Sequence, residues 1–355
     1  MDPLTRQNLS ATGGIAPDGE YIDNIFSGRV YVGNGGNKTI NNGIDLQGSG
    51  GMTWVKYRST SGDHHHVNDS ERGVTNTLFL DQMDASSVKS DRVNQYNNNG
   101  FSLGSNYRTN GSGGKFFSAT FRKQPKFFDI VTWTGTGTDK NISHNLGSAP
   151  GMIWVKCTSD VAQWCVYHRS LGATEYVYMD NTNINTSGGV WANTEPTSTQ
   201  FTVRDNIRVN GVGRTYVAYL FAHNDGDADF GYGGNQDVIK CGDYSISGNL
   251  ATTINLGFEP SFIIIRKKNV GSNWWVFNAD RGFGPYYFRW MYANTTGAEE
   301  YKTYKGVYPI ATGFVHDGTN NGQWGNDDYF YMAIRRADGY VGKPATTSQS
   351  VFWKR

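Results

Sequence analysis

The chain has 355 residues, of which 45 are glycine, 14% are aromatic and only 18% are charged. Its 32 basic and 31 acidic residues leave a formal net charge of +1, which argues against a general electrostatic attachment to nucleic acid or to an anionic membrane. No stretch approaches the roughly 20 apolar residues that cross a bilayer, and the amino terminus lacks the apolar core of a signal peptide. We therefore expect a protein that is made in a cytoplasm and does not insert into membranes.

The residue types favour strands over helices. Glycine and asparagine supply turns, while tyrosine, phenylalanine, tryptophan, valine and threonine supply strands. No long run places apolar residues at the spacing of a helix face. The three cysteines are odd in number and form no tight framework, so we expect reduced, buried thiols. The composition predicts an all-β protein of many short strands.

In chain order, residues 1–27 come first. They are polar and rich in glycine, with prolines at Pro3 and Pro17. We interpret them as an extended arm or attachment segment.

A short apolar strand that ends in a cation then occurs three times. It reads Gly-Met-Thr-Trp-Val-Lys at 51–56, Gly-Met-Ile-Trp-Val-Lys at 151–156 and Ser-Phe-Ile-Ile-Ile-Arg at 261–266. Such a run predicts a strand that is buried on at least one face and reaches solvent at Lys56, Lys156 and Arg266.

The surrounding residues repeat as well. The first two copies keep an offset of 100 residues, from Trp54 and Trp154 to Phe121 and Phe221. The third copy follows at offsets of 110 to 113, which fit insertions in surface loops. This pattern predicts three tandem antiparallel β-sandwich-like (jelly-roll-like) repeats of about 100 residues. We place them at 28–126, 127–226 and 237–338, followed by a carboxyl-terminal tail at 339–355.

Within the first two copies, Asn110-Gly111 and Asn210-Gly211 occupy matching positions. This dipeptide favours two-residue hairpins, because both central residues of a type I′ turn need a positive φ. We therefore predict a hairpin turn at each of the two positions.

Three groups of residues have the chemistry of a metal site or a catalytic site. His64-His65-His66 on a strand would suit a metal ion on the axis of a trimer, although a polar strand is the better interpretation. Residues 225–229 begin like a calcium loop but lack the glycine and glutamate that such a loop needs later. The acidic pairs Glu299-Glu300 and Asp327-Asp328 would point to opposite faces of a strand. We predict no catalytic residue, no metal and no cofactor.

An aromatic group lies in the third copy. Trp274 and Trp275 are adjacent, and strand alternation predicts that one of them faces the core and the other faces outward. Aromatic core is the simpler interpretation of the group. The functional interpretation is a platform on which a sugar ring stacks, formed by Trp275, Tyr286 and Trp290.

Three stretches also resemble a known family. They are residues 39–56, residues 142–156 with the motif Ile-Ser-His-Asn-Leu-Gly-Ser-Ala-Pro-Gly-Met-Ile-Trp-Val-Lys, and residues 216–223 with Tyr-Val-Ala-Tyr-Leu-Phe-Ala-His. They resemble a domain of unknown function that recurs in tandem in structural proteins of tailed bacteriophages, above all marine phages of the cyanophage and pelagiphage type. The resemblance covers most of residues 20–345 and implies a component of a tail fibre, an appendage or the particle surface. It brings no catalytic motif.

The resemblance and the composition together predict a non-enzymatic bacteriophage virion protein. We expect a tail fibre or appendage component that binds other virion proteins and contacts a host surface glycan. A homotrimer is the expected oligomer, because fibres are commonly trimeric, and weak binding by several copies would add up to attachment. Two alternatives stay open: a capsid or tail decoration protein without a receptor, and a tail protein that cleaves polysaccharide.

Overall fold

The computed structural model describes residues 20–183, 186–231, 233–248, 250–303, 306–318 and 325–337. In these residues nearly every regular element is a strand, and the named strands pair antiparallel. The predicted all-β, sandwich-type fold is confirmed. No helix in the described residues is long and apolar enough to cross a membrane. Most of the predicted arm, residues 1–19, and the predicted tail lie outside the described residues.

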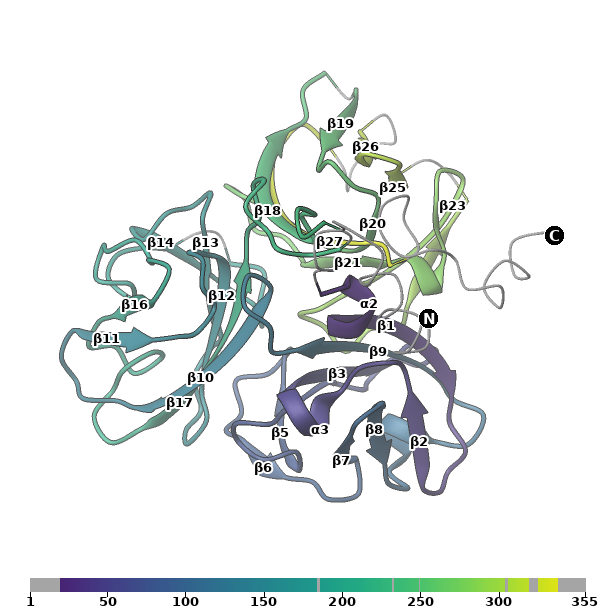
Figure 1. Ribbon diagram of the computed structural model, residues 1–355, viewed down its shortest axis with the longest axis horizontal. Coiled ribbons are helices and arrows are strands. Elements are labelled where there is room, and N and C mark those ends of the chain that lie inside the picture. The colour runs from purple at the N-terminus through teal and green to yellow at the C-terminus, as the bar shows by residue number, and fades with distance from the viewer. Residues whose placement is uncertain are drawn as a thin grey trace, which may run out of the picture.

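Three units lie around a common centre, and each contributes one large sheet (Figure 1). We call them the first unit (residues 22–122), the second unit (residues 128–222) and the third unit (residues 239–335). In every unit the first strand pairs with the last strand, and the last strand pairs with the central strand. Each unit therefore closes on itself before the next one begins.

The first unit has a six-stranded sheet covered by a three-stranded sheet. In spatial order the large sheet contains β1 (Phe26–Val32), β9 (Lys115–Arg122), β3 (Gly51–Tyr57), β4 (His65–Asp69), β5 (Asn76–Phe79) and β6 (Ser87–Val88). The small sheet contains β2 (Lys38–Asn41), β8 (Gly100–Leu103) and β7 (Val93–Asn97), and the helical turns are α2 (Ile22–Ile25), α3 (Leu46–Ser49) and α4 (Tyr107–Asn110).

The predicted arm, residues 1–27, extends too far along the chain, because its last residues belong to the first unit. Ile22, Ile25 and Phe26 are at most 6% exposed and pack in the hydrophobic core. Their apolar side chains place residues 22–27 in the first unit, because burial of such side chains is favourable.

The second unit has a six-stranded sheet and a two-stranded sheet. The large sheet contains β10 (Phe128–Thr134), β17 (Thr215–Ala222), β12 (Pro150–Cys157), β13 (Cys165–His168), β14 (Glu175–Tyr178) and β15 (Thr186–Ser187), and the small sheet contains β11 (Lys140–Ser143) and β16 (Gln200–Val203). Cys157, Cys165 and Cys241 are buried and unbridged, as predicted.

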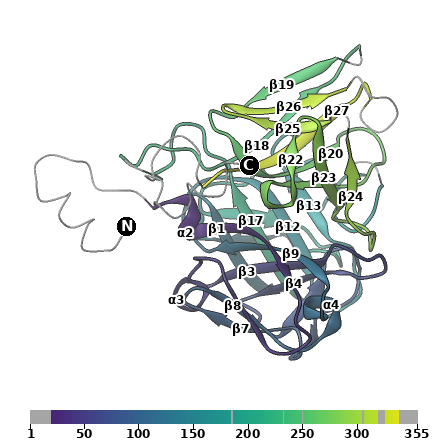
Figure 2. The same cartoon turned by 90° about the vertical axis from the view of Figure 1, so that its right-hand side faces the viewer.

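The third unit has a seven-stranded sheet and a three-stranded sheet. The large sheet contains β18 (Ile239–Ser245), β27 (Asp328–Arg335), β20 (Pro260–Lys267), β21 (Trp275–Asn278), β23 (Tyr287–Tyr292) and β22 (Phe283–Gly284), with β24 (Glu300–Lys302) also paired to β23. The small sheet, at the top of Figure 2, contains β19 (Ala251–Asn255), β26 (Gly313–Asp317) and β25 (Val307–Ile310). A 3-10 turn, η1, spans Ala279–Arg281.

The large sheet of the third unit is buried on both faces. Along β20, Phe262 and Ile264 join the hydrophobic cluster that contains Trp54, whereas Ile263 and Ile265 join a second cluster with the small sheet. Because side chains alternate along a strand, one face meets the other units and the opposite face meets the unit's own small sheet.

The inner faces of the large sheets form one aromatic centre. Trp54 lies edge-on to Trp154, with ring centroids 6.1 Å apart, and 6.3 Å from Phe262. Phe121 meets Phe221 at 5.6 Å and Phe262 at 6.3 Å. These edge-to-face contacts within 7 Å are the favourable geometry for aromatic pairs, and they join all three units.

Hydrogen bonds around this centre run in one direction and close a ring. Strand register makes His65, Trp164 and Trp274 equivalent positions, one in each unit. Trp164 Nε1 donates to Phe79 O at 2.9 Å, from the second unit to the first, and Trp274 Nε1 donates to Tyr178 O at 2.8 Å, from the third to the second.

The ring is completed by His65. Its Nδ1 accepts from Trp54 Nε1 at 2.9 Å. The proton therefore lies on Nε2, which donates to Thr295 O at 3.1 Å, from the first unit to the third. The offset of 100 residues between the first two copies would align His64 with Trp164, but the strand register aligns His65 with Trp164.

The cations that end the central strands do not reach solvent, contrary to the prediction. Lys56, Lys156 and Arg266 are all 0% exposed. Each donates to a backbone carbonyl of the neighbouring unit: Lys56 Nζ to Thr296 O at 3.2 Å, Lys156 Nζ to Met83 O at 3.0 Å and Arg266 Nη1 to Asn181 O at 3.1 Å. Burial lowers the pKa of Lys56 and of Lys156 to about 8 and that of Arg266 to about 9. The strand ends at a unit boundary, where a long polar side chain satisfies carbonyl groups that water does not reach.

The predicted Asn-Gly hairpins are also wrong. Asn110 is the last residue of α4, and Gly111 has a φ of −56°. The Asn110 amide is buried, accepts from Asn34 N at 3.0 Å and donates to Gly104 O at 2.9 Å. Asn210 holds its loop in the same way, accepting from Thr136 N at 3.1 Å. Here the asparagine side chain replaces a local turn, a known alternative for this residue.

The ring of hydrogen bonds predicts a specific stability difference. Trp164→Phe removes an indole N–H that serves two carbonyls of the first unit. Trp154 is buried as completely, but its indole N–H has no acceptor among the described residues, so Trp154→Phe is the matched control. We expect Trp164→Phe to lower the free energy of unfolding by about 1–3 kcal/mol more than Trp154→Phe, measured by urea denaturation. Equal losses would show that the inter-unit bond is not stabilising.

The buried histidines predict loss of stability in acid. Burial lowers the pKa of His168 to about 4, against about 6.5 in an unfolded chain. Since the unfolded chain binds the proton first, stability falls as the pH drops from about 6.5 towards 4.

A variant isolates this effect from that of the carboxylates. Because His168→Gln cannot bind that proton, we expect the stability gap between the native chain and the variant to shrink by about 1.4 kcal/mol per pH unit below 6.5. Urea midpoints at a series of pH values test this, and a constant gap would contradict it.

Candidate functional site

A pocket of about 290 Å³ lies where the first and third units meet. Arg58 directly follows β3 and Lys115 begins β9, both in the first unit. The third unit contributes Arg281 from η1, Arg289 from β23 and Glu299 from the segment before β24. Ser59 and Ala298 complete the lining.

Backbone hydrogen bonds fix the two sides of this pocket. Arg58 N donates to Lys115 O at 3.0 Å within the first unit. Glu299 N donates to Arg58 O at 2.8 Å across the unit boundary. The cationic side chains therefore start from a backbone that is already held in place, which lowers the cost of ordering a binding site.

A single carboxylate lies among the arginines. Glu299 Oε1 pairs with Arg58 at 2.8 Å and with Arg289 at 3.1 Å, while Oε2 pairs with Arg281 at 3.2 Å. The lining therefore contains four cations and one anion, which leaves a positive surplus, and we call this cavity the charged pocket.

The inner arginine is held firmly. Arg281 is 4% exposed, donates from Nη2 to Val276 O at 2.7 Å and lies 5.0 Å from the Phe117 ring centroid. Burial lowers its pKa to about 10, although Glu299 opposes that shift. The Nε groups of Arg58 and Arg281 are buried without a hydrogen-bond partner among the described residues. Such donors are costly unless a ligand or water accepts from them.

Tyrosines stand beside the outer arginine. The Arg289 guanidinium lies 5.0 Å from the Tyr301 ring and 5.7 Å from the Tyr287 ring, within cation–π range. The two tyrosine rings are 4.7 Å apart and are 49% (Tyr287) and 41% (Tyr301) exposed. Tyr286, which precedes Tyr287 in the turn between β22 and β23, is 64% exposed. We call Tyr286, Tyr287 and Tyr301 the tyrosine rim.

An equivalent pocket at the boundary of the first and second units has different chemistry. Ser86 N donates to Thr158 O at 2.8 Å, which matches the bond between Glu299 and Arg58. Thr158 and Ser86 therefore occupy the positions that Arg58 and Glu299 have in the charged pocket. The cavity at this boundary is larger, about 600 Å³.

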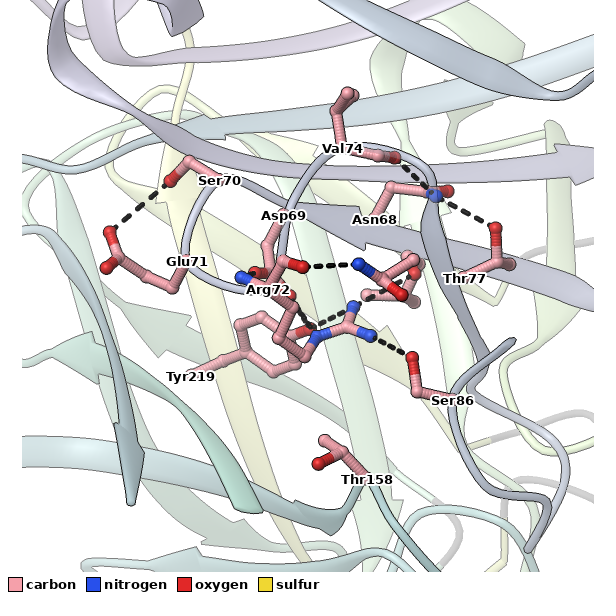
Figure 3. A network of polar contacts seen from close by, with 12 residues as sticks. Asn68, Asp69, Ser70, Glu71, Arg72, Val74, Thr77, Ser86, Thr158 and Tyr219 are labelled. Carbon is pink, nitrogen blue, oxygen red and sulfur yellow. Dashed lines mark hydrogen bonds and ion pairs between the residues drawn. The ribbon is translucent and has the colours of Figure 1, made fainter. Parts of the chain in front are cut away.

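The buried arginine of this second pocket is neutralised locally. Arg72 corresponds to Arg281, since each donates to the carbonyl five residues earlier. Arg72 pairs with Asp69 at 2.6 Å and also contacts Ser86 and Tyr219, as Figure 3 shows. The Tyr219 hydroxyl donates to Asp69 Oδ2 at 2.6 Å. This network joins the first two units without leaving a charge surplus.

The residues predicted to stack on a sugar do not come together. Trp275 is 3% exposed and Trp290 is 0% exposed, and both pack in the sandwich core of the third unit. Trp274 is also buried, on the opposite face, so neither neighbour points to solvent. The alternation was correct, but both faces of the sheet are covered. Of the three predicted residues only Tyr286 is at the surface.

The three histidines considered for a metal ion have other partners. His65 and His66 are buried, and His66 Nδ1 lies 2.9 Å from the Arg92 guanidinium, so it accepts a hydrogen bond instead of facing an axis. His64 pairs with Asp81 at 2.8 Å. Across the described residues, no group of three or more His, Cys, Asp or Glu side chains is placed to hold a metal ion.

The acidic segments have other partners. In the calcium-like loop, Asp229 pairs with Lys126 at 2.9 Å and Asp225 lies 3.7 Å from Lys240. Asp327 pairs with Lys267 at 2.6 Å, and the Glu299 carboxylate is shared by three arginines. The charged pocket is not evident from the sequence, because its four cations come from separate elements and none of these elements is basic by itself.

Comparison with known proteins gives a family and no function. A family described as a domain of unknown function, DUF7483, matches residues 22–337. None of the curated proteins matches the chain.

The burial pattern predicts different outcomes for two residues of the expected sugar platform, Trp290 and Tyr286. Trp290→Ala should lower the free energy of unfolding by about 3–5 kcal/mol, because it opens a cavity in a closed core. Tyr286→Ala should change it by less than about 0.5 kcal/mol, as expected for an exposed side chain. Urea denaturation of both variants tests this. A stable Trp290→Ala protein would contradict the placement of that side chain in the core.

Proposed function

The chain belongs to the DUF7483 family, and we propose that it is a non-enzymatic virion structural protein that contacts a host surface. In this proposal it forms part of a tail fibre or other appendage of a bacteriophage particle. The resemblance of residues 39–56, 142–156 and 216–223 to phage structural proteins supports the virion assignment.

The observation that carries the surface-contact role is the charged pocket beside the tyrosine rim. It combines fixed cations with exposed aromatic faces at a boundary between two units. Surface sites that bind saccharides need both polar anchors and flat apolar faces, and this pocket offers both without local rearrangement.

The interior supports a mechanical role. Aromatic contacts and the ring of hydrogen bonds join the three units, so force on one unit passes to the other two. Because three units of one chain already enclose the centre (Figure 1), the proposed homotrimer would assemble through outer surfaces. Several copies on one particle would then raise a modest affinity by multivalency.

The same rigidity favours a second candidate, a capsid or tail decoration protein that binds the particle lattice and no receptor. A decoration protein needs a stable folded body and a surface for its own particle. The two candidates differ in where the chain lies on the virion and in whether the charged pocket meets a ligand outside the particle.

Immunogold labelling of intact virions with an antibody against the third unit tests the proposal. We expect label on the tail or on projections from it. Label spread evenly over the head would favour the decoration protein and contradict host contact. A particle without label, from a lysate in which the antibody detects the free protein, would overturn the virion assignment itself.

A further inference from the structure

We propose that the pocket of Arg58, Lys115, Arg281 and Arg289 binds the oxyanion of an acidic saccharide, with the sugar ring against the tyrosine rim. The oxyanion is a sulfate ester or a uronate carboxylate. This inference rests on the proposed function, because it gives the chemistry of the surface that the protein would contact.

The charge balance of the pocket is the first argument. One cation would suffice to neutralise Glu299, yet three arginines pair with it and Lys115 adds a fourth positive charge to the lining. Gathering like charges in a partly buried site destabilises a folded protein. A bound anion would offset that cost.

Hydrogen-bond geometry is the second argument. An arginine presents five N–H donors in a planar fork that matches carboxylate and sulfate oxygens. Arg58 and Arg289 line the pocket with side chains that are 17% and 31% exposed, so an oxyanion can reach their guanidinium groups. Charge-assisted hydrogen bonds to an oxyanion are the strong kind that such donors form.

Pocket size and surroundings indicate a saccharide. A cavity of about 290 Å³ takes an anionic substituent and part of one ring, and the remainder of a chain would lie outside. Tyr287 and Tyr301 flank Arg289 at the surface, where their faces can pack against the C–H face of a pyranose. Side-chain exposure decreases inward, from 31% at Arg289 and 17% at Arg58 to 0% at Arg281.

The equivalent pocket between the first and second units strengthens the assignment. There Asp69 neutralises Arg72, and Thr158, Thr215 and Ser86 line the cavity. That boundary closes without surplus charge, so packing two units together does not require the four cations of the other boundary.

Binding of three polysaccharides to the intact chain tests the proposal, measured by calorimetry at low and at high salt. The probes are dextran sulfate, polygalacturonate and uncharged dextran. We expect binding to dextran sulfate, to polygalacturonate or to both, weakened by salt, and none to dextran. Preference for dextran sulfate identifies a sulfate ester as the natural group, and preference for polygalacturonate identifies a uronate.

Variants show whether the pocket is responsible. Lys115 is exposed at the start of β9, so Lys115→Glu should fold normally and weaken binding about tenfold or more. Lys115→Arg should retain binding. Arg289→Gln is the second variant in the pocket, and Lys140→Glu, on β11 of the second unit, is the matched control with the same charge change and no expected effect.

Two results would overturn the inference. One is equal weakening by Lys115→Glu and Lys140→Glu, which indicates general charge attraction. The other is the absence of binding to both anionic probes by a folded protein. If either result occurs while immunogold label lies on tail projections, the proposed host contact is retained and only the saccharide ligand is rejected. If the labelling fails but the pocket binds the anionic probes, the saccharide site is retained and the virion assignment is rejected.

Discussion

Burial of both faces of each large sheet is the constraint on which the rest of the molecule depends. The outer face is covered by a small sheet of the same unit, and the inner face meets the other two units. Three inner faces can be covered together only if the units surround one centre. Trp54, Trp154 and Phe262 occupy that centre and touch edge to face.

Closing this arrangement buries polar groups, and the chain satisfies them in the same way at each boundary. His65, Trp164 and Trp274 each donate to a carbonyl of the neighbouring unit. Lys56 and its two counterparts do the same from the ends of the central strands. The side chains differ in kind, but each reaches across a boundary to an acceptor that water cannot serve. The two pockets at the unit boundaries also differ in this way, because different side chains stand at equivalent positions.

The charged pocket is a consequence of the same geometry. A unit boundary leaves a cavity where the end of β3 and the start of β9 face β23 and η1 of the third unit. At one boundary the cavity is lined by Arg58, Lys115 and Glu299, and at the other Thr158, Thr215 and Ser86 stand at the equivalent positions. A charge surplus beside exposed tyrosines can therefore be gained or lost through a few substitutions, without altering the sheets.

The sequence by itself determined the strand class, the equivalence of the three central strands and the buried, unbridged cysteines, because these follow from local residue preference and from repetition. The sugar-platform interpretation put Trp275 and Trp290 at the surface, and the strand pattern put the cations Lys56, Lys156 and Arg266 there, but all five are buried. Alternation along a strand tells which residues share a face and not what covers that face. The dipeptide Asn110-Gly111 predicted a hairpin turn, because the sequence does not show the long-range hydrogen-bond partners of the Asn110 amide. The charged pocket was decided by tertiary structure alone, because its cations come from residues 58, 115 and 281–289, three regions far apart in the chain.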